Sequence, residues 1–210
     1  INSFQNNDKY FEVLTCQIVS LIQNKKKIKM SKREGNFVTL AEVFKQVGKD
    51  PIRYYMISTK NETSIDFDMD EVIKKNKDNK VFYCQYAYAR ASSVINKSRD
   101  LKLDINKIEN LDFKKYLTDD EWVLIKDLIS YPYLLVQSCK NKEPHKLVNY
   151  LENICSQFHS IWNKGKDNTS LRFIDEKEIN HTKSKLFWIE SFRIVLNDIF
   201  TIIGIDSPEK

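Results

Sequence analysis

Apolar residues recur at three- and four-residue spacing through most of the second part of the chain, which is typical of amphipathic helices. One such stripe consists of Leu147, Leu151, Ile154, Phe158 and Ile161. The pattern predicts four long helices, over residues 81–97, 118–139, 144–162 and 178–203. Four helices of this kind can bury one shared core.

Particular residues should begin, bend or end these helices. Thr118 and Glu121 stand at the spacing of a capping box, which should begin the second helix. Pro132 should kink or split that helix, because proline has no amide hydrogen and its ring crowds the preceding turn. Gly204 should end the last helix.

A different pattern comes near the start of the chain. Over residues 11–22, Leu14, Cys16 and Ile18 alternate with polar residues before a more continuous apolar run. Alternation with a period of two predicts a strand. An irregular basic stretch follows, from residue 23 to residue 38.

Short helices should come next. Thr39 is placed to cap a helix that ends at Gly48. Asp50-Pro51 should cap and start a second helix, reaching about residue 59. Asp68 can cap another helix around residues 72 and 73. We therefore expect a small α/β unit, then a domain boundary near residues 75–80, then the helical part.

Composition limits the class of protein. The 210 residues are 41% hydrophobic and 30% charged, with four glycines and four prolines. These values exclude a mainly disordered chain and leave too few turn residues for an all-β protein. No apolar run is long enough for a membrane span, and the first residues lack the layout of a signal peptide. The formal charge of +5 permits polyanion binding but does not establish it.

Cysteine and histidine residues give no clear metal site. Cys155 and His159 lie one helical turn apart, but the four cysteines are otherwise widely separated and lack a C-x-x-C spacing. We expect buried free thiols in a reducing compartment. His145 is expected to be exposed in the first turn of its helix, His159 to lie at the surface, and His181 to have no partner.

The segment richest in chemistry runs from Lys29 to Asn36, with the sequence Lys-Met-Ser-Lys-Arg-Glu-Gly-Asn. Two ammonium groups three residues apart on a loop can reach successive phosphates of one nucleotide. A lysine that closes on a triphosphate during reaction would stabilise the charge of the transition state. Charge alone also fits a solvated basic run, a nuclear-import-like segment or a nonspecific polyanion patch.

The order of these residues favours the first interpretation. Lys-Met-Ser-Lys resembles the signature loop of class I aminoacyl-tRNA synthetases, and residues 17–40 resemble arginyl-tRNA synthetase more closely. Residues 50–54, 66–68, 77–79 and 82–91 resemble the start of the helical anticodon-binding domain of that family. Residues 158–165 and 171–173 resemble a later part of that domain, and residues 204–210 its C-terminus.

The resemblance implies an enzyme that joins arginine to AMP, using ATP with Mg²⁺, and then transfers the arginine to its tRNA. It implies that Lys32 makes the main catalytic phosphate contact and that Lys29 assists. Met30 and Ser31 are implied as ATP-binding residues, although Met30 can equally be a packing anchor. No metal-binding residue is expected in this chain.

The resemblance also implies a division of the chain. Residues 1–78 would be the C-terminal end of a Rossmann-like α/β catalytic domain, and residues 79–210 an all-helical anticodon-binding bundle, so that the fold is mainly α. The chain begins with Ile1 and lacks the His-x-Gly-His element. We therefore expect a fragment that is inactive alone, with arginine bound by a missing upstream part. A cytoplasmic monomer without membrane contact is expected.

Anticodon recognition should use aromatic side chains, because unstacked bases stack on aromatic faces. Candidates are Tyr83, Tyr86 and Arg90, which share one helix face at positions i, i+3 and i+7, together with Phe158 and Trp162 on another helix. Phe158 continues an apolar stripe and can instead belong to the core, and Tyr86 can simply pack at a rim.

A rival interpretation is a noncatalytic helical module that binds RNA or protein, in which the Lys-Met-Ser-Lys run is only a basic patch. The two interpretations predict different local structures. A strand over residues 14–22 that leads into an exposed loop favours the synthetase, whereas a continuous helix through Lys29 favours the rival.

Overall fold

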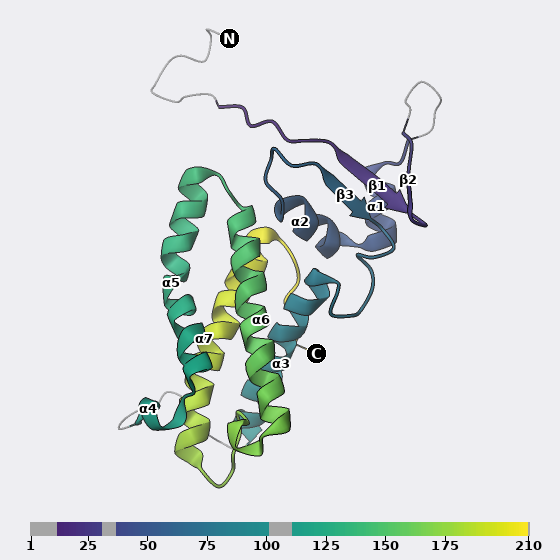
Figure 1. Ribbon diagram of the computed structural model, residues 1–210. Coiled ribbons are helices and arrows are strands. Elements are labelled where there is room, and N and C mark those ends of the chain that lie inside the picture. The colour runs from purple at the N-terminus through teal and green to yellow at the C-terminus, as the bar shows by residue number, and fades with distance from the viewer. Residues whose placement is uncertain (1–11, 31–36, 101–110, 210) are drawn as a thin grey trace.

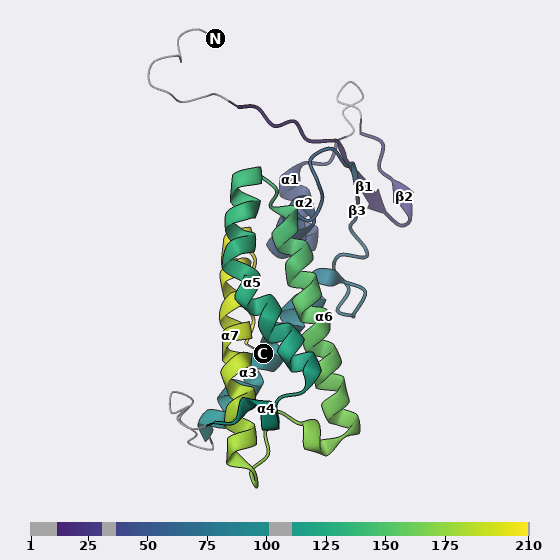
Figure 2. The same ribbon diagram turned by 60° about the vertical axis from the view of Figure 1, so that its left-hand side comes forward.

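A computed structural model describes residues 12–30, 37–100 and 111–209 of the chain. In these residues a small sheet with two short helices stands beside a bundle of four long helices (Figure 1). The turned view in Figure 2 shows the same division into two parts. The mainly helical fold class predicted from the sequence is confirmed.

The sheet has the strand order β2-β1-β3 within the described residues. β1 (Val19–Gln23) pairs antiparallel with β2 (Lys26–Lys27) and parallel with β3 (Ile65–Asp68). The turn between β1 and β2 places Asn24 and Lys25 at φ values of 50° and 61°. Left-handed conformations of this kind let a two-residue turn match the twist of its strands. The start of the basic segment, Lys25 to Lys27, therefore lies in the β1–β2 hairpin at the edge of the sheet.

The predicted strand over residues 11–22 is shorter and later than expected. β1 starts at Val19, while Leu14 and Ile18 are exposed. The reason is pairing: Val19 lies opposite Ile65, the first residue of β3, and a strand needs a neighbour for its backbone hydrogen bonds. The sequence pattern does not predict β3, because this short strand depends on a partner far earlier in the chain.

The first helix begins as predicted. The Thr39 hydroxyl accepts a hydrogen bond from the Glu42 amide at 3.2 Å, and the Glu42 carboxylate accepts one from the Thr39 amide at 2.7 Å. This reciprocal capping box starts α1 (Leu40–Val47). Gly48, with φ of 82°, ends the helix.

Two details after α1 differ from the prediction. α2 (Lys49–Ile57) begins one residue before Asp50-Pro51, with Gly48 as its N-cap, so Asp50 is not the cap. Pro51 still lies in the first turn, where an amide has no partner within the helix. Asp68 caps no helix: its Oδ1 accepts hydrogen bonds from the amides of Asp70 and Glu71, within a run of turns. Such short side-chain bonds compete with helix formation.

The four predicted long helices are all present. They are α3 (Lys80–Asp100), α5 (Asp119–Asn141), α6 (His145–Asp167) and α7 (Ile179–Ile203). Two short elements, α4 (Phe113–Tyr116) and a 3-10 helix (Thr169–Leu171), are additional. The inward faces of the long helices form one core, whose fully buried members include Leu124, Leu151, Ile154, Phe192, Leu196 and Phe200. A smaller apolar cluster lies between the sheet and α1.

The predicted start of α5 and end of α7 are confirmed, whereas the predicted split inside α5 is not. Thr118 and Glu121 form the predicted capping box of α5, and Gly204, with φ of 75°, ends α7. Pro132 does not split α5, which continues through it. Because Pro132 is exposed, solvent can bond the carbonyl that loses its amide partner.

Residues 203–206, at the end of α7 and just after it, connect α2 with the helical bundle through hydrogen bonds. Arg53 of α2 donates from Nε to the carbonyl of Ile203 at 2.9 Å. Gln85 of α3 donates to the Asp50 carboxylate at 2.7 Å and to the carbonyl of Asp206 at 3.0 Å. A side chain at Gly204 would stand 2.9 Å from Arg53 Nε, so glycine is needed there for space as well as for its positive φ.

Thiol and histidine positions correct the sequence analysis in part. Cys84 and Cys155 are buried as expected, but Cys16 and Cys139 are exposed. His145 is buried, not exposed. No helix among the described residues is long and apolar enough to cross a membrane.

A buried ion pair links α5 with α7. Lys185 and Glu121 are in contact, and each side chain is only 1% exposed. The Glu121 carboxylate also accepts from the amide of Thr118 at 2.8 Å. The same group therefore caps α5 and neutralises a buried lysine.

Replacing Lys185 by Ala should lower the free energy of unfolding by about 3–5 kcal/mol, because Glu121 would remain buried without a counter-charge. Urea unfolding followed by circular dichroism measures this. Lys164→Ala, which removes the exposed partner of Asp120 near the same helix end, is the matched control and should cost at most about 1 kcal/mol. Equal losses in the two variants would contradict the burial argument.

Candidate nucleic-acid interface

Four of the predicted RNA-contacting residues come together where α3 meets α6. Tyr83, Tyr86 and Arg90 lie along one face of α3, as their spacing predicts, and Trp162 of α6 faces them. The guanidinium carbon of Arg90 lies 4.1 Å from the ring centre of Tyr86 and 4.9 Å from that of Trp162. Both distances are within cation–π range. We call Tyr83, Tyr86, Arg90, His159 and Trp162 the α3–α6 cluster.

His159 is the member that the sequence analysis missed. It is buried, so the surface position expected for it is wrong. Its Nδ1 is 2.9 Å from Arg90 Nη1, and its Nε2 is 3.1 Å from the carbonyl oxygen of Tyr83. Its ring centre lies 4.3 Å from that of Tyr83. The available signal was its spacing, since His159 precedes Trp162 by three residues and shares its face of α6.

The protonation of His159 follows from its partners and its burial. Burial lowers the pKa of His159 below the ordinary histidine value, and the charge of Arg90 lowers it further, although the bond with the Tyr83 carbonyl opposes this. A neutral imidazole has one donor nitrogen and one acceptor nitrogen. Because a guanidinium can only donate, Nδ1 accepts from Arg90 and Nε2–H donates to the Tyr83 carbonyl.

The cluster presents flat rings and a cation to solvent. Tyr86 is 43% exposed, while Tyr83, Arg90 and Trp162 are half-buried. Phe82 stacks on Tyr86 with ring centres 5.8 Å apart and planes 12° apart. Exposed aromatic faces beside a guanidinium can stack a base and attract a phosphate.

Phe158 does not belong to this surface, so its predicted anticodon contact is wrong. It is 0% exposed and stacks on Phe192 with ring centres 4.6 Å apart. Phe173 and Trp188 enclose it further. The ring points from α6 toward α7, where it fills the core.

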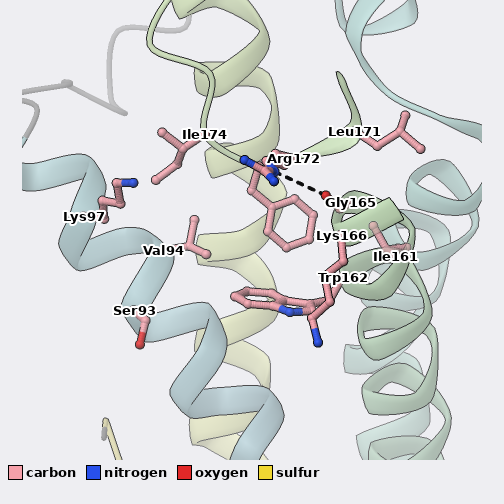
Figure 3. A pocket seen from close by; sticks show the side chains of 11 residues that line it. Ser93, Val94, Lys97, Ile161, Trp162, Gly165, Lys166, Leu171, Arg172 and Ile174 are labelled. Carbon is pink, nitrogen blue, oxygen red and sulfur yellow. Dashed lines mark hydrogen bonds between the residues drawn. The ribbon is translucent and has the colours of Figure 1, made fainter. Parts of the chain in front are cut away.

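A pocket of about 360 Å³ adjoins the α3–α6 cluster through Trp162 (Figure 3). Its apolar lining includes Val94 and Phe173, and Figure 3 shows the indole of Trp162 along one side. Lys97, Lys166 and Arg172 contribute positive charge, and none of the lining residues is acidic. Arg172 is anchored by a hydrogen bond from Nε to the carbonyl of Gly165 at 3.4 Å. The pocket thus suits a flat ring with a nearby negative charge.

The predicted phosphate loop lies only partly within the described residues. Lys29 and Met30 are exposed and follow β2, whereas Ser31 and Lys32 lie outside the described residues. The described residues between Val19 and Met30 form the β1–β2 hairpin and contain no helix. This is the local structure expected of the synthetase interpretation rather than of the rival.

The remaining candidates form no second site. Asp66 and Lys27 form an ion pair at 2.8 Å, and the hydrogen bond from Lys27 lowers the pKa of the Asp66 carboxyl. Asp68 is occupied in its turn, so the two carboxylates do not act as a pair. Within the described part of the chain, no group of three or more His, Cys, Asp or Glu residues could hold a metal ion.

Comparison with known families identifies both parts of the structure. The family described as DALR anticodon binding domain matches residues 84–210. The chain belongs to this anticodon-binding family. The family described as tRNA synthetases class I (K) matches residues 17–107 and so includes the sheet and the hairpin. The resemblance to a class I synthetase is confirmed.

Two relatives with similar sequences carry the same name. A protein named arginine–tRNA ligase from Bartonella henselae is 42% identical, over 98% of this chain and 36% of the relative. One of the same name from Brucella canis is 39% identical, over 94% of this chain and 34% of the relative. This anticodon-binding chain therefore spans about a third of the length of the relatives it matches.

Solved structures agree with the fold. A putative arginyl-tRNA synthetase from Campylobacter jejuni superposes with a TM-score of 0.74 at 26% identity, over 93% of this chain and 40% of that one. The arginyl-tRNA synthetase of Thermus thermophilus gives a TM-score of 0.69 at 20% identity, over 92% of this chain and 34% of that one. The second likeness supports the fold alone.

Core and surface aromatics should respond differently to truncation. Phe158→Ala should lower the free energy of unfolding by about 3–5 kcal/mol, because it leaves a cavity among buried rings. Tyr86→Ala should cost only about 1 kcal/mol, since its ring is 43% exposed and leaves no core cavity. Urea unfolding of the two variants tests this, and similar costs would contradict the placement of these residues.

Proposed function

We propose that this chain is the part of an arginyl-tRNA synthetase that recognises the anticodon loop and supplies the ATP-phosphate loop. The observation that carries the proposal is the α3–α6 cluster, in which a guanidinium lies against two aromatic rings at the surface of an anticodon-binding fold. The names of the relatives support arginine as the amino acid.

The cluster would recognise the loop by stacking and by hydrogen bonds. Tyr86 and Trp162 offer ring faces on which unstacked bases can lie. Arg90 can make five N–H hydrogen bonds. Its described side-chain contacts use Nη1 toward His159 and Nη2 toward Tyr86 at 3.1 Å, so donors remain for base edges or phosphates. Tyr83 would support the site through its contact with His159. The adjoining pocket offers room for a further flat ring.

The hairpin side of the molecule would serve the nucleotide. Lys32, assisted by Lys29, would hold the phosphates of ATP and stabilise the charge on the departing pyrophosphate. Ser31 and Met30 would contact ATP or hold the loop in its closed form. Mg²⁺ would arrive with ATP as part of the substrate. The exposed position of Lys29 and Met30 after a hairpin supports this assignment.

The remaining parts of the reaction would be supplied elsewhere. In this proposal arginine and the rest of ATP are bound by sequence that the relatives have beyond the third matched here, and the chain alone is inactive. Residues 1–78 would form the C-terminal end of the catalytic domain, and residues 79–210 would form the anticodon-binding domain of a cytoplasmic monomer. The smaller apolar cluster supports such a boundary, because its buried members all precede residue 78. Contact between the two parts comes from α2, where Tyr54 lies in the bundle core and Tyr55 packs against both clusters.

Removing the cluster should weaken RNA binding by this chain. Tyr86→Ala or Arg90→Ala should each raise the dissociation constant for an arginine-tRNA anticodon stem-loop by about 5- to 100-fold, the range of one lost stacking contact. Fluorescence anisotropy with labelled RNA measures the change. Tyr133→Ala, which removes a 71% exposed ring of α5 away from the cluster, is the control and should leave binding unchanged.

The rival, a nonspecific RNA-binding module, predicts another outcome. Competition between stem-loops that differ only in the anticodon should favour the arginine anticodon if the proposal holds. A nonspecific module would ignore that change, and its binding would fall uniformly with salt. Binding that shows no preference for the arginine anticodon would therefore contradict the proposed function.

The phosphate loop requires a complete active site for its test. We suggest replacing the matching third of the Bartonella henselae relative by this chain and measuring ATP–pyrophosphate exchange. Lys32→Ala should lower the exchange rate by more than about tenfold, because a transition-state charge contact is lost. Lys26→Ala, an exposed lysine of β2, is the control. A smaller effect of Lys32→Ala than this would exclude the proposed role.

A further inference from the structure

The placement of Arg90 depends on an uncharged partner. Its Nη1 lies 2.9 Å from Nδ1 of His159, and its Nη2 donates to the Tyr86 hydroxyl at 3.1 Å. Within the described residues, no ion pair joins Arg90 to a carboxylate. The imidazole is itself held by the bond from Nε2 to the Tyr83 carbonyl and by the adjacent Tyr83 ring. Both ring nitrogens therefore have fixed roles.

We propose that neutral His159 is a positioning residue that holds the Arg90 guanidinium between Tyr86 and Trp162, and that its protonation releases Arg90 and weakens RNA recognition. This inference rests on the proposed function and adds a residue and a pH dependence to it. His159 itself is buried and would not touch the RNA.

Protonation of His159 should weaken its contact with Arg90 rather than strengthen it. Protonation of Nδ1 removes the acceptor that Arg90 uses and places a second positive charge about 3 Å from the first. The described groups that face His159 from α3 are Arg90 and the phenols of Tyr83 and Tyr86, and Cys155 lies one turn earlier on α6. Within the described residues, none of its hydrogen bonds reaches a carboxylate that could offset the added charge.

Two substitutions of His159 distinguish the roles of its two ring nitrogens. The side-chain amide of Asn can put an oxygen near the position of Nδ1, whereas the longer amide of Gln reaches the position of Nε2 and leaves Arg90 without its acceptor. At pH 7.5 we expect His159→Asn to bind the stem-loop within about threefold of the wild type. We expect His159→Gln to weaken binding by about 10- to 100-fold, the scale of one lost hydrogen bond to a charged group.

Coupling to Arg90 distinguishes positioning from a general loss of structure. His159→Gln should have no further effect on binding in an Arg90→Ala background, because Arg90 is the group through which it acts. Urea unfolding and circular dichroism of each variant show whether the fold is intact. Equal binding losses in His159→Asn and His159→Gln, or additive losses with Arg90→Ala, would overturn the inference.

The pH profile gives a second readout. Wild-type affinity should fall at pH values below the ordinary histidine pKa of about 6.5, because burial lowers the pKa of His159. Affinity of His159→Asn should not show this fall, although His145 and His181 remain. Added positive charge elsewhere would strengthen RNA binding, so a decrease is specific to this contact. A fall of the same size in both proteins would overturn the inference.

Failure of the inference differs from failure of the proposed function. If Arg90→Ala weakens anticodon-specific binding while His159→Gln does not, the function stands and the role of His159 is wrong. If the wild-type chain does not distinguish anticodons and Arg90→Ala has no effect, both are wrong.

Discussion

The packing of α3 against α6 and α7 is the constraint on which the rest of the structure depends. Small buried side chains on α3, among them Ala87 and Ala91, allow the helices to approach closely. One strip of α3 therefore lies in the core, and the adjoining strip with Tyr86 and Arg90 lies at the edge that faces α6. Because Trp162 is fixed on α6, a change in this packing would separate it from Arg90. The surface proposed to bind RNA is in this sense a consequence of the core.

The same helix connects that surface with the α/β unit. Gln85 directly precedes Tyr86 and bonds both Asp50 of α2 and the backbone of Asp206. At the start of α3, the Asn79 side chain donates to the carbonyl of Val72 at 2.8 Å and accepts from the amide of Val81 at 3.2 Å. Hydrogen bonds thus connect the start of α3 with the turns that follow β3. β3 in turn pairs with β1 of the hairpin that leads to the proposed phosphate loop. The two proposed functional regions are therefore joined by hydrogen-bonded contacts as well as by the chain itself.

The sequence predicts local features of this fold well, and long-range ones less well. Thr39, Thr118 and Gly204 act within one turn of their own helix, so their neighbours in sequence determine their roles. β3 depends on a distant strand, which no local pattern reveals. Phe158 and Trp162 are one helical turn apart, yet one lies in the core and the other at the surface. Only the position of α7 decides between them. The burial of His159 likewise depends on α3, which a single-helix pattern does not include.

The partners of Arg90 on α3 and of Arg193 on α7 show why Arg90 is suited to a ligand. Arg193 of α7 donates two hydrogen bonds to Glu190, at 2.7 and 2.8 Å, so a carboxylate neutralises its charge. Arg90 is held by an imidazole and a phenol, which orient the guanidinium but leave its charge uncompensated. Nε of Arg90 is buried and has no hydrogen-bond partner among the described residues. A carboxylate in place of His159 would hold the same geometry but would repel a phosphate. Neutral His159 therefore fixes the guanidinium of Arg90 without cancelling its attraction for an anionic ligand. The same arrangement makes the position of Arg90 sensitive to protonation of His159.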